Sequence, residues 1–340
     1  MSAPSIEVID DETRLVALAD DWNALLGETP EASAFQSLAW ITACRSARPS
    51  NRRLFIVVVR DGADVVGILP TEIGIHGDLR FVGQGFSNYL GPIYRASHAG
   101  AVVEALAALL ARDARVSLLD FGGLREPSPF LAALRRTTIS GWSRPHAVET
   151  ATCPFLDLTP GWETIYARRK GKQRSNFARK GKRLERLGEV EFQEIVEPDD
   201  VRAALPAMMD LYERRWADRR ESGGFAGHHR AFHELAGPAL AAARHARVSL
   251  LRVDGQIVAF SYGLRVGGVT TSYVLAHDDA LGAYSPGLLL LLRLLEAACR
   301  RGDREYDFSI GEESYKDAWA TGERTVFHVF CWRRGSTATI

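Results

Sequence analysis

The sequence has few residues of the kinds that would place it among exported or disulfide-stabilised proteins. Its 340 residues include four cysteines, and no two of them form a C-x-x-C pair. This scatter excludes a disulfide framework and the usual zinc spacings, and it fits a reducing compartment. The cysteines are Cys44, Cys153, Cys299 and Cys331.

A metal-binding helix is not indicated either. His229 and His233 are four residues apart, as metal ligands on a helix can be. Arg230 stands where the helical protease motif requires a glutamate. We therefore interpret these two residues and His228 as solvated helix histidines, and we expect no metal cofactor.

Signals for export or membrane insertion are also missing. The first residues, MSAPSIEVIDDETR, are polar and acidic, whereas a secretory signal has a basic tip and an apolar core. The most apolar run, Leu288 to Leu292, is interrupted by Arg293 and Glu296 well before the roughly 20 residues that cross a bilayer. We expect a cytoplasmic protein without a transmembrane segment.

The sequence has no excess charge of either sign, because 42 Lys and Arg balance 42 Asp and Glu. No global field attracts nucleic acid, although a local basic patch can. A hydrophobic content of 46% with 25% charged residues is typical of a globular protein, and the length allows two domains.

The most informative stretch runs from Gly282 to Trp319 and contains the pattern of a helix start. Pro286 suits the first position of a helix, and Ser285 suits the cap before it. The backbone donors of Gly287 and Leu288 then point to an open helix end, where a phosphate or carboxylate binds readily.

The second half of the sequence predicts a mixed α/β sheet. The turn pairs Asp254-Gly255 and Gly267-Gly268 predict three antiparallel strands joined by two-residue hairpins. The predicted strands are 190–196, 248–253, 256–265, 270–275, 304–309 and 326–332, and the predicted helices are 199–220, 228–244 and 286–301.

The first half repeats this plan weakly. The turn Asp61-Gly62 lies 193 residues before Asp254-Gly255, and Asp120-Phe121-Gly122 lies 187 residues before Asp307-Phe308. Such near-equal offsets suggest a duplicated domain, and chance is the alternative. The predicted elements here are helices 13–26 and 37–48 and strands 54–60 and 65–73.

Several motifs together resemble a known family. They are Tyr284-Ser285-Pro286-Gly287, Asp307-Phe308 with Gly311, Tyr315-Lys316 with Trp319, and the basic segment from Lys170 to Gly188. The pattern resembles the GNAT N-acyltransferases, and within them the CelD-like acetyltransferases and their FemAB relatives. The likeness extends over residues 150–333 and reaches the N-terminal half only in outline.

The resemblance implies an α/β fold with a mixed sheet and two GNAT-like domains in tandem. Residues 1–150 would form a degenerate N-terminal domain, and residues 151–340 a C-terminal domain with the donor site. It also implies acyl-CoA as cosubstrate, held by Tyr284, Ser285, Gly287 and Leu288. The donor loop departs from the family pattern Gln/Arg-x-x-Gly-x-Gly/Ala, because Ala-Tyr-Ser-Pro separates Gly282 from Gly287.

Acyl transfer to an amine needs a held donor, a route for the amine proton and stabilisation of the oxyanion. Asp307 or Glu312 can act as base, and Tyr315 can protonate the leaving group. The resemblance to FemAB-like proteins implies that Lys316 acts at the reacting carbonyl. Asp307 can equally cap the turn towards Gly311, and Tyr284 and Tyr315 can equally be packing residues.

The segment from Arg168 to Arg186 is the sharpest charge anomaly, with ten Lys or Arg and one Glu. We predict that it lies on one helix over residues 162–187. A solvated helix face is one interpretation. The other is a phosphate-rich ligand bound by Lys170, Lys172 and Arg174, namely the nucleotide of CoA, a nucleotide-linked sugar acceptor or tRNA.

The loop Gly83 to Tyr89 lies where the first domain would have its donor loop, but it leads into Leu90-Gly91-Pro92 and not directly into a helix. We expect no second donor site there. Asn88 and Tyr89 are candidates for lining an acceptor site, and a plain glycine-rich loop is the alternative.

We therefore expect an N-acyltransferase that moves an acyl group, in the first instance acetyl, from acyl-CoA to a small-molecule amine or amino sugar. Transfer would be direct within a ternary complex. The CelD-like resemblance points to envelope or exopolysaccharide biosynthesis. The alternatives are a FemAB-like transfer of an aminoacyl group from tRNA, and a non-catalytic protein that binds a partner through the basic segment.

Overall fold

The computed structural model describes residues 4–47, 51–216, 225, 228–311 and 313–335, without the side chain of residue 228. The chain divides into two compact units. Unit 1 comprises Met1–Cys153 with Arg324–Ile340, and unit 2 comprises Pro154–Glu323. Strands β9 (His146–Asp157) and β15 (Gly322–Trp332) each contribute residues to both units.

Unit 2 is built on a mixed sheet, as the sequence patterns predict. Its hairpin turns are Asp254-Gly255, with φ of 47° and 78°, and Gly267-Gly268, with φ of 55° and 75°. Positive φ at both central residues matches the twist of the flanking strands and is easiest for glycine and aspartate or asparagine. The strand order is β10 (Val190–Ile195), β11 (Ala246–Val253), β12 (Gln256–Val266), β13 (Val269–His277), β14 (Glu305–Asp307) and the end of β9.

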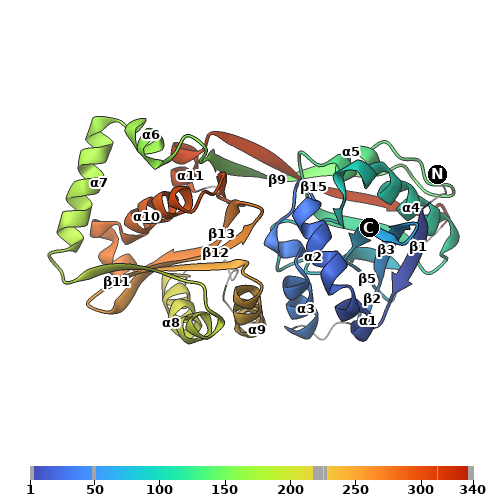
Figure 1. The fold of residues 1–340 in the computed structure, drawn as a ribbon, viewed down its shortest axis with the longest axis horizontal. Helices are drawn as coiled ribbons and strands as arrows, with labels where there is room; N and C mark the ends of the chain where they lie inside the picture. The colour runs from blue at the N-terminus through green and yellow to red at the C-terminus, as the bar shows by residue number, and fades with distance from the viewer. Residues whose placement is uncertain (1–3, 48–50, 217–224, 226–227, 312, 336–340) are drawn as a thin grey trace. The chain divides into compact units, whose positions relative to one another are not determined.

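Helices cover both faces of this sheet (Figure 1). Helices α8 and α9 lie on one face, and α10 lies on the other with α7 over it. The helix α10 packs a stripe of buried leucines against the sheet, including Leu290, Leu291, Leu294 and Leu295. The helices of unit 2 are α6 (Trp162–Ala167), α7 (Gly171–Leu184), α8 (Pro198–Trp216), α9 (His228–Ala242), η3 (Asp279–Tyr284), α10 (Pro286–Arg300) and α11 (Ser314–Trp319).

The prediction of one basic helix over residues 162–187 is wrong, because the chain forms α6 and α7 with a break between them. Lys170 has extended backbone (φ −54°, ψ 142°), and its N–H is capped by the Gln173 side chain at 3.2 Å. Helix α6 ends at Ala167, and the guanidinium of Arg169, within the break, lies 4.7 Å from the centre of the Trp319 ring.

Unit 1 has two sheets. The first has the order β1 (Ser5–Ile9), β3 (Ile56–Asp61), β4 (Asp64–Leu69) and β7 (Ile93–Tyr94). The second has the order β15, β8 (Leu118–Arg125), β6 (Asp78–Phe81), β5 (Thr71–Ile73) and β2 (Arg53–Leu54). The helices are α1 (Glu12–Ala17), α2 (Ala19–Glu28), η1 (Ala34–Gln36), α3 (Leu38–Ala47), η2 (Ala96–His98), α4 (Ala99–Arg112) and α5 (Pro129–Leu134).

Two predictions for unit 1 need correction. The strand expected over 65–73 is divided into β4 and β5 at Pro70, which has no N–H for a strand ladder. The helix expected over 13–26 is divided into α1 and α2 at Leu18.

Both units contain the same crossover. In unit 2, β13 and β14 are parallel neighbours joined through α10, and in unit 1, β6 and β8 are parallel neighbours joined through α4. Helix crossovers are the usual connection between parallel strands.

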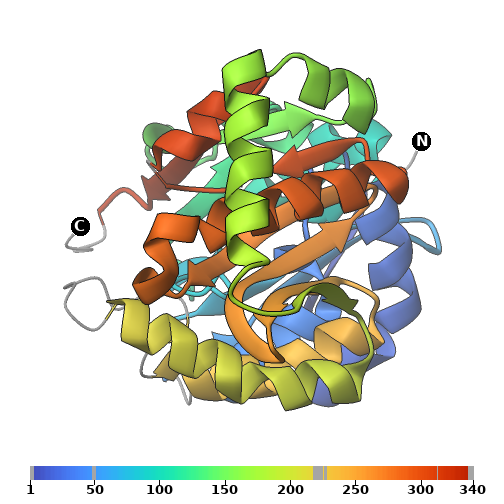
Figure 2. The same cartoon turned by 90° about the vertical axis from the view of Figure 1, so that its left-hand side faces the viewer.

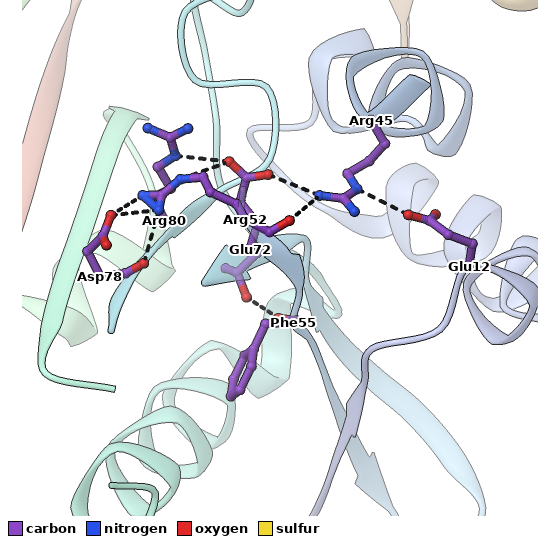
Figure 3. A network of polar contacts seen from close by, with 8 residues as sticks. Glu12, Arg45, Arg52, Phe55, Glu72, Asp78 and Arg80 are labelled. Atoms are coloured by element: carbon purple, nitrogen blue, oxygen red, sulfur yellow. Dashed lines mark hydrogen bonds and ion pairs between the residues drawn. The ribbon is translucent and has the colours of Figure 1, made fainter. Parts of the chain in front are cut away.

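Unit 1 contains a network of arginines around one buried carboxylate (Figure 3). Glu72 accepts from Arg80 Nε at 2.9 Å, pairs with Arg52 Nε at 3.3 Å, and reaches Arg45 Nη1 at 3.4 Å. Glu72 is 6% exposed. The pKa of Arg52 is lowered, mainly by burial and next by the charge of Arg80. Glu72 is among the carboxylates whose charge raises it again.

We expect Glu72→Ala to lower the free energy of unfolding by about 3 kcal/mol, because it leaves arginines together without their shared carboxylate. The measurement is urea-induced unfolding followed by circular dichroism. Glu12→Ala is the matched control, since the Glu12 side chain also pairs with Arg45 but is 55% exposed. Its expected cost is below about 1 kcal/mol. Equal costs for the two variants would contradict the prediction.

Candidate functional site

The candidate site lies where the two parallel strands of unit 2 separate. Strands β13 and β14 pair over only three residue pairs, from Val269 with Glu305 to Thr271 with Asp307. Beyond Thr271, β13 continues to His277, whereas the chain turns away after β14. A cavity of about 340 Å³ opens at this point.

The cavity wall comes from four parts of unit 2. Side chains from the second half of strand β13 and from the first two turns of α10 line it. The segment after β14 supplies the reactive groups, and the C-terminal end of α8 completes the wall. The lining residues are Arg215, Trp216, Ser272, Tyr273, Leu275, His277, Gly287, Leu288, Leu291, Phe308, Ile310, Glu313, Tyr315 and Lys316.

Lys316 is a buried cation at the cavity wall. It is 3% exposed, and its Nζ donates to the Ile310 carbonyl at 2.8 Å and pairs with Glu313 Oε2 at 2.8 Å. A Cβ at Gly311 would lie 2.5 Å from this Nζ, so glycine is needed for the close approach. Gly311 also has φ of 137°, which side chains rarely adopt. The Asp-Phe, Gly and Tyr-Lys motif therefore folds into one compact arrangement around the lysine.

Tyr315 lies beside Lys316 in the same wall. Burial raises the pKa of the Tyr315 hydroxyl, and the nearby Tyr306 and Glu313 raise it further. The phenol therefore keeps its proton at neutral pH and can donate it. Burial also raises the pKa of Tyr306, to about 12, behind the cavity wall.

Asp307 does not line the cavity. It is 1% exposed, and its Oδ1 accepts from the backbone N–H of Ser309 at 2.7 Å. Ser309 has φ of 62°, so this hydrogen bond supports a left-handed turn at the end of β14. The structure thus places Asp307 in the turn and not among the groups that face the cavity. Glu312 lies outside the described residues.

The start of α10 differs from the prediction that Ser285 caps it. Ser285 has φ of 55° and makes no side-chain cap hydrogen bond. Its hydroxyl instead accepts from Lys180 Nζ of α7. Tyr284 lies under the guanidinium of Arg183, 5.2 Å from the ring centre, so two cations of α7 reach this helix end.

The three basic residues selected from the sequence lie elsewhere on α7. Lys170, Lys172 and Arg174 are exposed at the beginning of that helix, and the first two line a surface depression there. The ion pairs found among the described residues of unit 2 include no cation of segment 168–186. The basic segment thus forms no close ion pair with a carboxylate in this part of the chain, although the charge of Arg168 is among the causes that lower the pKa of Asp157.

Sequence reasoning missed the polar group on the other side of the cavity. Arg215 of α8 contacts the ring nitrogen Nδ1 of His277, and its Nη1 lies 3.4 Å from Asp279 Oδ1. His277 Nε2 also lies 3.4 Å from Asp279 Oδ1. An arginine donates only, so His277 Nδ1 accepts and the ring proton is on Nε2. No sequence signal joins these residues, because Arg215 is 62 positions from His277.

Asn88 and Tyr89 belong to unit 1. Tyr89 is 2% exposed, lies under the Arg125 guanidinium at 4.3 Å and meets Phe35 edge-on at 5.9 Å, whereas Asn88 is half-buried. At the crossover of unit 1, the Gln84 side chain lies 3.7 Å from where a Cβ on Gly122 would be. The hollow beside it, lined by Arg80, Gly83 and Gln84, is only about 20 Å³, against about 340 Å³ for the cavity of unit 2.

The expectation of solvated histidines is wrong for His233. This residue is completely buried, and its ring packs against those of Phe225, Phe232, Tyr262 and Tyr273. The apolar face of α9 places it there. Among the described residues there is no cluster of His, Cys, Asp or Glu able to hold a metal ion. No helix in the same part of the chain is long and apolar enough to span a bilayer.

Comparison with known families finds a match for the segment that forms the cavity. Residues 171–317, from α7 into α11, match a family model described as "Acetyltransferase (GNAT) domain". No curated protein sequence matches the chain.

Several solved structures share the fold. FemX is 11% identical, with 90% of this chain and 95% of FemX covered and a TM-score of 0.63. L-PGS from Bacillus licheniformis is 15% identical, with 93% and 91% covered and a TM-score of 0.59. A tandem GNAT protein from the clavulanic acid biosynthesis pathway is 15% identical, with 98% and 100% covered and a TM-score of 0.50. The fold is therefore an α/β fold with GNAT-like architecture, as the sequence resemblance implies.

We expect Gly287→Ala to lower the free energy of unfolding by about 1 to 3 kcal/mol through overpacking. The added Cβ would lie 2.7 Å from His277 Nδ1 and so displace the contact between His277 and Arg215. Urea-induced unfolding measures the change. Gly282→Ala is the matched control, because nothing lies within 4 Å of its added Cβ. A Gly287→Ala protein as stable as the control would contradict this account.

Proposed function

We propose that this chain is an N-acyltransferase of the FemAB-related, CelD-like kind that uses acyl-CoA, with acetyl-CoA as the first donor to test. The acceptor is a primary amine of a small molecule or amino sugar. The observation that carries the proposal is the cavity between β13 and the segment after β14. Within the GNAT-matched segment, it brings a buried lysine, a protonated tyrosine and a carboxylate to the start of α10.

The donor would bind with its phosphates at the start of α10. Free backbone donors there favour an anion, and Pro286 and Gly287 begin the helix. Lys180 and Arg183 of α7 add positive charge beside Ser285 and Tyr284. These two cations replace Lys170, Lys172 and Arg174 as our choice for the phosphates.

The pantetheine arm would then extend along β13 into the cavity. Beyond Thr271, no strand among the described residues pairs with the side of β13 that faces away from β12. Backbone groups on a free strand edge seek hydrogen-bond partners, and the two amides of pantetheine supply them.

Transfer would proceed directly, without a covalent enzyme intermediate. The amine nitrogen attacks the thioester carbon, and its proton passes to the Glu313 carboxylate, the cavity carboxylate nearest to Lys316. The Lys316 ammonium stabilises the developing oxyanion. The C–S bond then breaks, and the thiolate takes the proton of Tyr315. Return of the proton from Glu313 to Tyr315 through water completes the cycle.

Aminoacyl transfer from tRNA is the second candidate function. The basic segment favours it, because its cations form no ion pair with a carboxylate among the described residues, and backbone phosphates of RNA would pair with them.

Localisation in the cytoplasm and a role in envelope or exopolysaccharide biosynthesis are further parts of the leading proposal, and they rest on the family resemblance.

Tyr315→Phe should lower kcat by about 100-fold or more, because it removes the proton donor for the leaving thiolate. The Kd for acetyl-CoA should stay within about twofold, since the ring remains. The measurement is a thiol-release assay with a panel of amines, combined with calorimetry. Tyr284→Phe serves as the control, because that ring lies at the helix start and not in the cavity wall. An unchanged kcat in Tyr315→Phe would remove this residue from the mechanism.

Calorimetric titration with acetyl-CoA at low and moderate salt tests the donor itself. We expect binding with a small salt dependence, and none for ATP or free acetate. Activity that RNase abolishes, together with a steep loss of affinity as salt rises, would instead establish the aminoacyl-tRNA reaction.

A further inference from the structure

A second hollow in unit 2 lies between α7 and α10, outside the cavity described above. Figure 2 shows α7 crossing α10, and the two helices are in contact. Between them is a groove of about 470 Å³. Its floor includes Leu251 of β11, and its end is formed by α6. The groove is large enough for a single heteroaromatic base with its sugar.

One wall of the groove is aromatic. Trp162, Tyr166 and Phe177 all line it, and all three are only half-buried. The rings of Trp162 and Tyr166 are 5.1 Å apart, and those of Tyr166 and Phe177 are 6.4 Å apart. Phe177 is backed by Trp319, with ring centres 6.3 Å apart and planes 23° from parallel. Such a wall offers ring faces on which a flat ligand can stack.

The rim of the groove carries charges of both signs. Lys182 and Arg293 are the cations, and Glu185 and Glu296 are the carboxylates. Glu296 is positioned by Arg300 at 2.6 Å and by Arg293 at 3.3 Å. Carboxylates accept hydrogen bonds from an exocyclic amine, and the cations suit phosphate. Two carboxylates on the rim disfavour a long polyanion such as RNA.

The groove adjoins the start of α10 beside the cavity. Leu288 and Leu291 of α10 line the cavity, whereas Leu289, Leu292 and Glu296 line the groove. At 3.6 residues per turn these two sets lie on adjacent faces of the helix, roughly 100° apart. A ligand bent over the helix start therefore reaches both hollows.

From this geometry we propose that the groove between α7 and α10 binds the adenine nucleotide end of the acyl donor. The adenine stacks on Phe177 and Tyr166, and its amino group is directed to the rim carboxylates. Lys180, Lys182 and Arg183 bind the phosphates. The inference rests on the proposed use of acyl-CoA, and it gives a ligand to the cations of α7 that reach the start of α10, Lys180 and Arg183.

The test compares two donors that differ only in the nucleotide, acetyl-CoA and S-acetyl-4′-phosphopantetheine. In Phe177→Leu, we expect the Kd for acetyl-CoA to rise about tenfold, because base stacking is lost while packing on Trp319 is kept. The Kd for the phosphopantetheine donor should not change. Phe177→Tyr should bind acetyl-CoA as the unaltered protein does. Phe330→Leu is the matched control, since that ring is also half-buried but lines neither this groove nor the hollow beside it.

The outcomes separate the inference from the proposed function. Suppose that acetyl-CoA binds and that Phe177→Leu raises the Kd of both donors equally, or of neither donor. The groove is then not the nucleotide site, although the acyltransferase proposal stands. If the unaltered protein binds neither donor, the proposed function itself fails. Binding of tRNA that Phe177→Leu weakens, in a protein that binds neither acetyl-CoA nor the phosphopantetheine donor, would assign the groove to RNA and overturn the inference.

Discussion

The separation of two parallel strands is the constraint on which this site depends. Strands β13 and β14 share three residue pairs and then part, so a cavity opens inside an otherwise continuous sheet. The buried leucines of the crossover helix α10 belong to the same core cluster as Tyr306 of β14 and the following Phe308. Because α10 begins at the cavity, the same crossover brings a helix start, with its free backbone donors, next to the reacting groups.

The reacting groups are held by packing as much as by hydrogen bonds. Lys316 approaches Gly311 so closely that no side chain fits there, and the Ile310 carbonyl and Glu313 fix its ammonium. Tyr315 is buried enough to remain a phenol at neutral pH. A buried cation beside a proton donor is the arrangement that stabilises negative charge as it forms.

The two units share a crossover but use it differently. In unit 1 the Gln84 side chain lies beside Gly122, and Arg45, Arg52 and Arg80 pair with Glu72. In unit 2 a cavity opens where β13 and β14 part, and the cations of α7 form no ion pair with a carboxylate among the described residues. The cavity and these cations together are the reason why we assign the chemistry to unit 2.

Local signals in the sequence determined the hairpins Asp254-Gly255 and Gly267-Gly268, the start of α10 at Pro286, and the mixed α/β class. These features depend on φ preferences and apolar periodicity within a few residues, which a sequence displays directly. The resemblance also identified Tyr315 and Lys316, which the structure brings to one wall.

Only the tertiary structure decided which polar residues meet. Contacts between residues distant in the sequence decide the pairing of Arg215 with His277, the position of Lys180 on Ser285 and the burial of His233. Asp307 shows the same limit, because a carboxylate at a strand end can cap a turn or face a cavity, and packing around Ser309 directed it to the turn.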